Sequence, residues 1–145
     1  MNPEEIIRKA KRVIEEESRE LSKLSERLDH SFVRAVELIL NCEGKVITTG
    51  VGKSGHIAQK VASTLSSTGT PSHYLHPSEA LHGDLGVVES KDVVLAFSKS
   101  GESAEVLALL PYIKLLGTKL ISVTNNPNST LAKHSDVHIF LGVSK

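Results

Sequence analysis

The first thirty residues alternate apolar and charged positions with the period of a helix. The charged positions include eight acidic and seven basic residues. This spacing predicts an amphipathic helix with a narrow apolar seam, and Asn2 before Pro3 marks its start. The charged residues indicate a solvated face, although the seam could also pair with another subunit. Apolar residues recur at spacings of one, three, four and seven, at Ile6, Ile7, Val13, Ile14, Leu21, Leu24 and Leu28.

A second helix is predicted over residues 31–41, and Gly44 ends it. Beyond it, short β-rich runs alternate with helical stretches, the rhythm of βα units around a parallel sheet. The run at residues 93–97 is apolar throughout, which is typical of a central strand covered on both faces. The predicted strands are residues 46–49, 72–75, 93–97, 120–124 and 137–141.

Helices are predicted between these strands, over residues 54–67, 103–116 and 128–133. Pro111 should kink or break the second of them, and Gly117 is placed to cap its end. Asn126 and Pro127 should open the third. The sequence therefore predicts an α/β fold, a five-stranded parallel sheet flanked by helices, with a long N-terminal helix. We divide it into a helical segment, 1–43, that packs on a sheet domain, 44–145.

Composition removes several classes of function. Lysine plus arginine and aspartate plus glutamate both number 17, and aromatic residues make up 3%, so we expect no nucleic-acid partner. The single Cys42 excludes an internal disulfide framework and a cysteine-rich zinc site. No apolar run is long enough to span a bilayer, and the N-terminus lacks a signal-peptide pattern. We therefore expect a cytoplasmic protein without a membrane partner.

Four loops follow the carboxyl ends of the predicted strands, where open parallel sheets bind ligands. They are rich in glycine, serine, histidine or asparagine, and comprise residues 50–55, 76–86, 98–103 and 125–129. The first of these has the pattern G-x-G-x-x-G. It is not a Walker A loop, because Ile47 stands where that pattern needs glycine. Dinucleotide binding is also disfavoured, because no carboxylate follows the second strand before Glu79.

The loop at residues 98–103 follows the most apolar strand and opens a helix. Its three serine hydroxyls and the free N–H groups of a first helical turn could form a phosphate cradle. Alone, such a loop is more simply explained as a serine N-cap with ordinary turn residues. Two such loops, 50–55 and 98–103, on neighbouring strands favour a shared anion site. Because the cradle is mostly neutral, a small phosphate monoester suits it best.

Four stretches carry a resemblance to a known family. They are GVGKSGH (50–56), SSTGTP (66–71), HPSEALHGDLG (76–86) and SKSGESAE (98–105). Together they resemble the sugar isomerase (SIS) domain, and within it the arabinose-5-phosphate isomerases. The similarity runs over residues 44–145 and implies a three-layer sandwich of the Rossmann or flavodoxin kind. The first and third stretches are more specific to the isomerases than the serine loop is.

The resemblance implies an aldose–ketose isomerisation between D-arabinose 5-phosphate and D-ribulose 5-phosphate through an enediol. It implies no required metal or redox cofactor, a homodimer or homotetramer, and a place in carbohydrate metabolism such as lipopolysaccharide biosynthesis. The implied catalytic residues are Lys53, Glu105 and His82. The residues implied to bind substrate or phosphate are Ser54, Gly69, Thr70, His76, His82, Ser98, Ser100 and Ser103. His76 also matches a position associated with inhibitory zinc.

Simpler explanations exist for two of the implied catalytic residues. Lys53 could be a solvated loop lysine, and Glu105 could be a first-turn acid favoured by the helix dipole. The sequence also departs from the family after its last strand. Family members continue with a catalytic glutamate, a His-Pro-Gly-Gly segment and often two CBS domains. We therefore keep two alternatives to an active isomerase, a catalytically silent sugar-phosphate-binding module and a fragment that retains only the fold.

Overall fold

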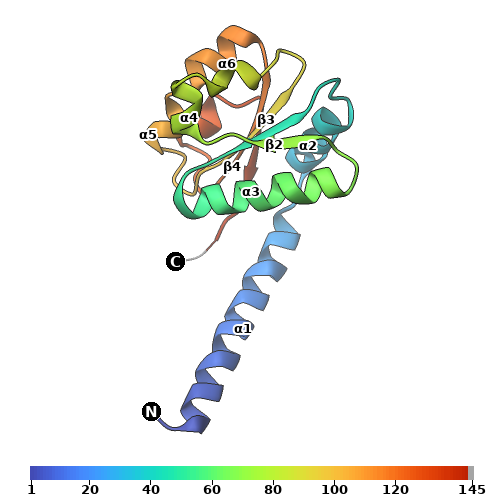
Figure 1. Ribbon diagram of the computed structural model, residues 1–145. Helices are drawn as coiled ribbons and strands as arrows, with labels where there is room; N and C mark the ends of the chain where they lie inside the picture. Colours follow the sequence, from blue (N-terminus) through green and yellow to red (C-terminus); the bar gives the residue numbers. More distant parts are fainter. Residues whose placement is uncertain (144–145) are drawn as a thin grey trace.

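The computed structural model describes residues 1–143, and its centre is a five-stranded parallel sheet (Figure 1). The strands lie in the order β2-β1-β3-β4-β5. Their register pairs Val46 with Val93 and Val93 with Lys119, so the three central strands start at one level. The five strands are β1 (Val46–Thr49), β2 (Ser72–Tyr74), β3 (Val93–Phe97), β4 (Lys119–Thr124) and β5 (Val137–Phe140). The predicted α/β class and all five strands are confirmed.

Helices cover both faces of the sheet. On one face, Ala35 of α2 and Leu65 of α3 pack with a buried cluster that includes Ile121. On the other, Ile113 of α6 and Leu131 of α7 pack with a cluster that includes Val94. The helices are α1 (Pro3–Arg27), α2 (His30–Leu40), α3 (Gly52–Ser67), α4 (Pro77–Leu81), α5 (Ala104–Leu107), α6 (Leu110–Leu116) and α7 (Thr130–Lys133), with a 3-10 turn, η1 (Asp84–Val87).

Pro111 breaks the helix that the sequence predicted over residues 103–116. Proline has no N–H to donate, and its ring clashes with the carbonyl four residues earlier, here that of Leu107. The structure accordingly ends α5 at Leu107 and starts α6 at Leu110. Gly117 then ends α6 with a φ of 75°, as predicted for a C-terminal cap.

Two local expectations needed correction. Helix α7 does not open at Asn126 and Pro127, because these residues form a turn closed by a hydrogen bond from Ser129 N–H to Asn126 C=O (3.1 Å). Ser129 then caps the helix by accepting from Ala132 N–H (3.2 Å). The predicted loop 76–86 contains helix α4, which starts at Pro77 behind the N-cap His76.

Helix α1 projects away from the sheet, and none of its residues is buried (Figure 1). It starts as predicted, with Asn2 accepting from Glu5 N–H (2.9 Å) in a capping box. Its apolar seam faces solvent, and Ile14 and Leu21 are 66% and 68% exposed. At its end, the Arg27 guanidinium donates to the Gly142 carbonyl (2.7 Å). Of the two N-terminal helices, α2 contributes the buried Ala35 to the core, and α1 contributes no buried residue.

No helix within residues 1–143 combines the length and apolarity that crossing a bilayer requires.

A buried carboxylate fixes the amino ends of β1 and β3. Asp92, whose side chain is 0% exposed, accepts from Lys45 N–H (2.8 Å), Lys45 Nζ (2.9 Å) and Glu89 N–H (2.8 Å). Burial alone would raise the pKa of Asp92, but the hydrogen bonds and the Lys45 charge outweigh it and lower the pKa. The ionised form is therefore the one that the fold stabilises.

We expect Asp92→Asn to lower the free energy of unfolding by about 2 kcal/mol at neutral pH, because an amide cannot accept all three bonds. Since folding lowers the pKa of Asp92, its contribution is complete above the unfolded pKa of about 3.9 and is lost as pH falls through the folded pKa. The gap between variant and wild type should therefore narrow in acid. Urea unfolding from pH 7 to pH 3 measures this, with exposed Glu89→Gln as control. A gap that stays constant over this range would contradict it.

Candidate functional site

A cavity of about 560 Å³ opens at the carboxyl ends of β1, β3 and β4. The chain leaves β1 toward β2 and leaves β3 toward β4, so β1 and β3 flank the topological switch point of the sheet. Ligands of open α/β sheets bind at this point, because the two connections diverge there. The cavity is lined by Val51, Ser54, Phe97, Ser98, Lys99, Ser100, Glu102, Ser103, Asn125 and Asn126.

The loop after β3 presents its hydroxyl groups in a fixed arrangement. Ser98 Oγ accepts from Gly101 N–H (3.0 Å), and Ser100 Oγ accepts from Glu102 N–H (3.1 Å). A hydroxyl that accepts from the backbone keeps its own hydrogen to donate elsewhere. Gly101 turns the loop with a φ of 70°, a conformation that other residues rarely adopt. The result is a set of hydroxyl donors suited to an anion.

The start of α3 forms the facing wall. Its N-cap, Val51, makes no side-chain cap hydrogen bond, so the N–H groups of the first turn lack a side-chain acceptor there. Gly50 allows the close approach behind them, because a Cβ there would lie 2.9 Å from the Ser54 carbonyl and 3.0 Å from that of Phe97. The positive end of this 16-residue helix therefore borders the cavity beside the Ser54 hydroxyl.

The structure brings the four predicted phosphate-binding serines together. Ser54, Ser98, Ser100 and Ser103 all line the cavity. Of the predicted catalytic residues, Lys53 is exposed in the first turn of α3, beside the cavity and outside its lining. Glu105 is exposed in the first turn of α5, where its Oε2 accepts from Ser103 Oγ (3.3 Å).

His76 and His82 lie along the same edge of the sheet, beyond the cavity lining. They cap the two ends of α4, and His76 Nδ1 accepts from Ser78 N–H (3.1 Å). A neutral His76 therefore carries its hydrogen on Nε2, with its ring edge-on to Tyr74. No group of three potential metal ligands occurs within residues 1–143, and zinc binding by His76 stays a prediction.

Gly69 and Thr70 lie at the other edge of the sheet. They follow α3 and precede β2, and Thr70 N–H donates to the Leu65 carbonyl (2.8 Å). Helix α3 has 16 residues and spans about 24 Å between the two edges. Within a single copy of the chain, Gly69 and Thr70 are therefore too far from the serine cradle to share a ligand with it. The signal was in the sequence, because residues that precede a strand of a parallel sheet cannot lie at its carboxyl end.

The SIS domain model matches residues 39–145. The chain belongs to the SIS domain family. It is 48% identical over 141 residues to arabinose 5-phosphate isomerase KdsD of Pseudomonas aeruginosa, covering 97% of this chain and 43% of the relative. It is 47% identical over 132 residues to arabinose 5-phosphate isomerase KpsF of Escherichia coli, covering 90% and 40%. This SIS chain thus spans less than half the length of these relatives.

A solved structure has the same fold as the SIS chain over nearly its whole length. The Escherichia coli protein c3406, in complex with arabinose 5-phosphate, superimposes with a TM-score of 0.95 at 42% identity. The match covers 99% of this chain and 77% of that one.

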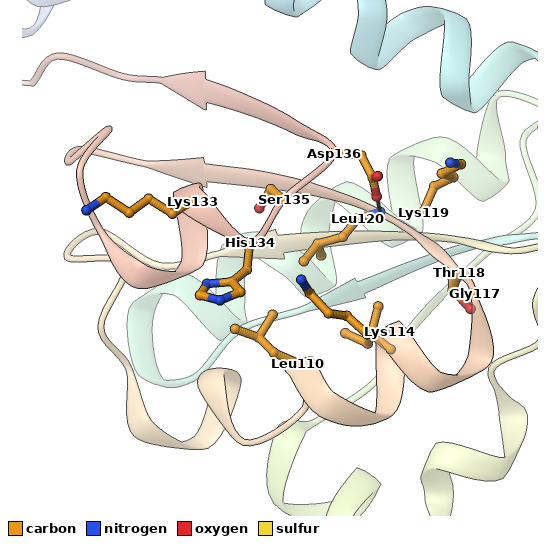
Figure 2. A pocket seen from close by; sticks show the side chains of 11 residues that line it. Leu110, Lys114, Gly117, Thr118, Lys119, Leu120, Lys133, His134, Ser135 and Asp136 are labelled. Carbon is orange, nitrogen blue, oxygen red and sulfur yellow. Dashed lines mark hydrogen bonds between the residues drawn. The ribbon is translucent and has the colours of Figure 1, made fainter.

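A second cavity, of about 450 Å³, lies at the opposite edge of the SIS sheet. Lys114, Lys133 and His134 are among its lining residues; in Figure 2 the Lys114 side chain extends toward His134, while Lys133 points away from both. The C-terminal ends of α6 and α7 border it, so their carbonyl groups place partial negative charge there. Lys114 and Lys133 lie in the last turns of these helices, where a positive side chain offsets the partial negative charge of the carbonyl groups. The serine cavity therefore remains the better anion site.

Two further residues line the serine cavity, Glu102 and Asn125, and neither was predicted as a site residue from its sequence pattern. Asn125 N–H donates to the Lys99 carbonyl (2.8 Å), and its side chain both donates to and accepts from the backbone of Val143. Glu102 lies inside the serine motif, and Asn125 directly follows a strand. The sequence therefore indicated that both residues lie in loops at the carboxyl ends of strands. It could not indicate what they contact, because that depends on which strands are neighbours in the sheet.

Gly101→Ala should disrupt the cradle, because a Cβ there would overlap Ser129 Oγ. Gly117→Ala is a matched control, since Gly117 has a similar φ of 75° but no atom within 4 Å of the place that a Cβ would take. We expect both to cost about 1 kcal/mol for the backbone conformation, and Gly101→Ala to cost roughly 2 kcal/mol more. Urea unfolding and phosphate titration by NMR measure the difference. Equal losses of stability and equal phosphate affinity would contradict this account of the loop.

Proposed function

We propose that this chain binds arabinose 5-phosphate in the serine cavity and forms the sugar-phosphate-binding part of an isomerase. That enzyme would interconvert D-arabinose 5-phosphate and D-ribulose 5-phosphate. The observation that carries the proposal is the convergence of Ser54, Ser98, Ser100 and Ser103 on one cavity at the switch point. The identity of 48% to KdsD supports this choice of sugar phosphate.

The cavity supports phosphate binding by hydrogen bonds more than by net charge. The hydroxyl oxygens of Ser98 and Ser100 accept from loop amides through their lone pairs. In this role each hydroxyl keeps its O–H group to donate to a phosphate. The uncapped start of α3 adds partial positive charge. A phosphate held here would anchor one end of a five-carbon sugar, and its carbonyl end would extend beyond the cradle.

The proposed reaction moves one proton between adjacent carbons. A base removes the proton from C2 of the aldose, the electron pair forms the C1–C2 double bond, and the C1 carbonyl oxygen takes up a proton to give an enediol. A proton then adds to C1 while the C2 hydroxyl loses its own proton and becomes the ketone. Glu105 is our candidate base, and Lys53 would stabilise the negative oxygen of the intermediate. His82 would contact the sugar. This chemistry needs no metal or redox cofactor.

A binding module without turnover is the second candidate. It is favoured because Lys53, His76 and His82 lie outside the cavity lining within one chain. Both candidates share the phosphate cradle, and they differ in whether protons exchange. We further propose a cytoplasmic location and a role in making sugar precursors of lipopolysaccharide.

We also propose that copies of the chain associate. The apolar seam of α1 includes Ile14 and Leu21, which are exposed to water. Exposing such apolar side chains is unfavourable, and a partner that covered them would remove this cost. Gly69 and Thr70 can reach a sugar in the cradle only if another copy supplies them, since α3 separates them within one chain.

Proton NMR of arabinose 5-phosphate with the protein in D2O tests the function. We expect ligand line broadening, deuterium uptake at the carbon next to the carbonyl, and formation of the ketose. Broadening without exchange would select the binding module, and neither effect would refute both candidates. Ser100→Ala should weaken binding about tenfold or more, because it removes a hydroxyl donor to a charged ligand. Ser90→Ala, at an exposed serine outside the cavity, is the control.

Light scattering tests association, and we expect a multiple of 15.7 kDa. The double variant Ile7→Lys and Ile14→Lys should lower the measured mass, because it places charges in the apolar seam. Glu15→Lys changes an exposed residue on the charged face and should leave the mass unchanged. A monomeric wild type would contradict the proposal.

A further inference from the structure

The serine loop, residues 98–103, belongs to no helix or strand, and a second segment holds it in place. Its backbone contacts residues 125–131, which run into the first turn of α7. The Lys99 carbonyl accepts from Asn125 N–H (2.8 Å), and the Gly101 carbonyl accepts from Leu131 N–H (3.1 Å). Gly101 also lies so close to Ser129 that a Cβ would overlap its hydroxyl. The loop is therefore shaped against α7.

Glu102 supplies the side-chain part of this attachment. Its Oε1 accepts from Thr130 N–H (2.5 Å), and its Oε2 accepts from Thr130 Oγ (2.9 Å). These two hydrogen bonds hold the pKa of Glu102 below its usual value, so the carboxylate is ionised when it makes them. One residue in the wall of the serine cavity thus binds the first residue of α7 through both of its oxygens.

The position of this carboxylate is otherwise unfavourable. A negative group in the wall of a cavity that takes a phosphate would repel the ligand. Both carboxylate oxygens of Glu102 accept from Thr130, and its backbone N–H donates to Ser100 Oγ (3.1 Å). The same residue therefore anchors the loop at one end and orients a predicted phosphate-binding hydroxyl at the other.

We propose that Glu102 is a positioning residue, which clamps the serine loop to Thr130 and so sets the Ser98 and Ser100 hydroxyls for a sugar phosphate. The inference rests on the proposed function for its ligand, but the clamp itself can be measured without one. Because the hydroxyls are fixed before binding, the ligand does not have to order the loop.

The test compares variants of the full chain that differ in clamp geometry and in charge. Glu102→Ala removes both acceptors, whereas Glu102→Gln removes the charge and keeps an oxygen for Thr130 N–H. Thr130→Val removes one donor, and Thr130→Ser keeps it. Glu89→Gln, at an exposed glutamate paired with Lys91, controls for loss of a surface charge.

Amide hydrogen exchange of the ligand-free protein is the first measurement. We expect Glu102→Ala to speed exchange at Gly101, Glu102 and Thr130 by about tenfold or more, because two charge-assisted hydrogen bonds are lost. Glu102→Gln and Thr130→Ser should stay within about threefold of wild type. The glutamine oxygen can accept from Thr130 N–H while its NH2 donates to the Thr130 hydroxyl, and serine keeps both donors. Unchanged exchange in Glu102→Ala would overturn the clamp, whether or not the protein binds arabinose 5-phosphate.

Affinity for arabinose 5-phosphate, measured by NMR titration, is the second measurement. We expect Glu102→Ala to weaken binding about tenfold. The double variant Glu102→Ala and Thr130→Val should bind with nearly the same affinity as Glu102→Ala, because the two residues act through one contact. Equal or tighter binding by Glu102→Ala would overturn the positioning role and leave the carboxylate as a repulsive group. A wild type that binds no arabinose 5-phosphate would refute the proposed function, while the exchange result would still decide the clamp.

Discussion

The parallel pairing of β1 with β3 determines where the chemistry of this molecule can lie. Val46 pairs with Val93 and Thr49 with Ala96, so the two strands start at the same level and end within one residue of each other. Their following segments then leave in opposite directions and face each other across one cavity. Asp92 holds the amino ends of the same two strands through Lys45, at the far edge of the sheet. The serine cavity thus depends on a pair of strands whose register is set by backbone pairing and whose amino ends are held by Asp92.

The cavity achieves anion complementarity with few charges. Serine hydroxyls that already accept from backbone amides, together with the uncapped start of α3, provide donors at fixed positions. The carboxylate of Glu102 is compatible with this arrangement because Thr130 engages both of its oxygens. A neutral, pre-ordered cradle suits a small phosphate ester, whose single charged group must be held in one orientation.

Helix α1 is attached to the rest of the molecule at its base, close to the site. Arg27 donates to the Gly142 carbonyl (2.7 Å), and the next residue, Val143, donates its N–H to Asn125 Oδ1 (2.7 Å). Asn125 in turn donates to the Lys99 carbonyl in the serine loop. The direction in which α1 projects is therefore tied, through a short series of hydrogen bonds, to the wall of the cavity. If the apolar seam of α1 binds another copy of the chain, the contact of Arg27 with Gly142 would connect that interface to the cavity wall.

The sequence by itself determined the features that depend on neighbouring residues. Apolar runs located the five strands, Asn2 and Pro3 located the start of α1, and Pro111 located the break between α5 and α6, since each acts within one helical turn or one strand. The residue types of the serine-rich loop also indicated an anion site. Tertiary structure decided the strand order, which gathers four serines into one cavity. It also decided that Glu102 meets Thr130, 28 residues away, because such pairings depend on which strands become neighbours and not on any local preference.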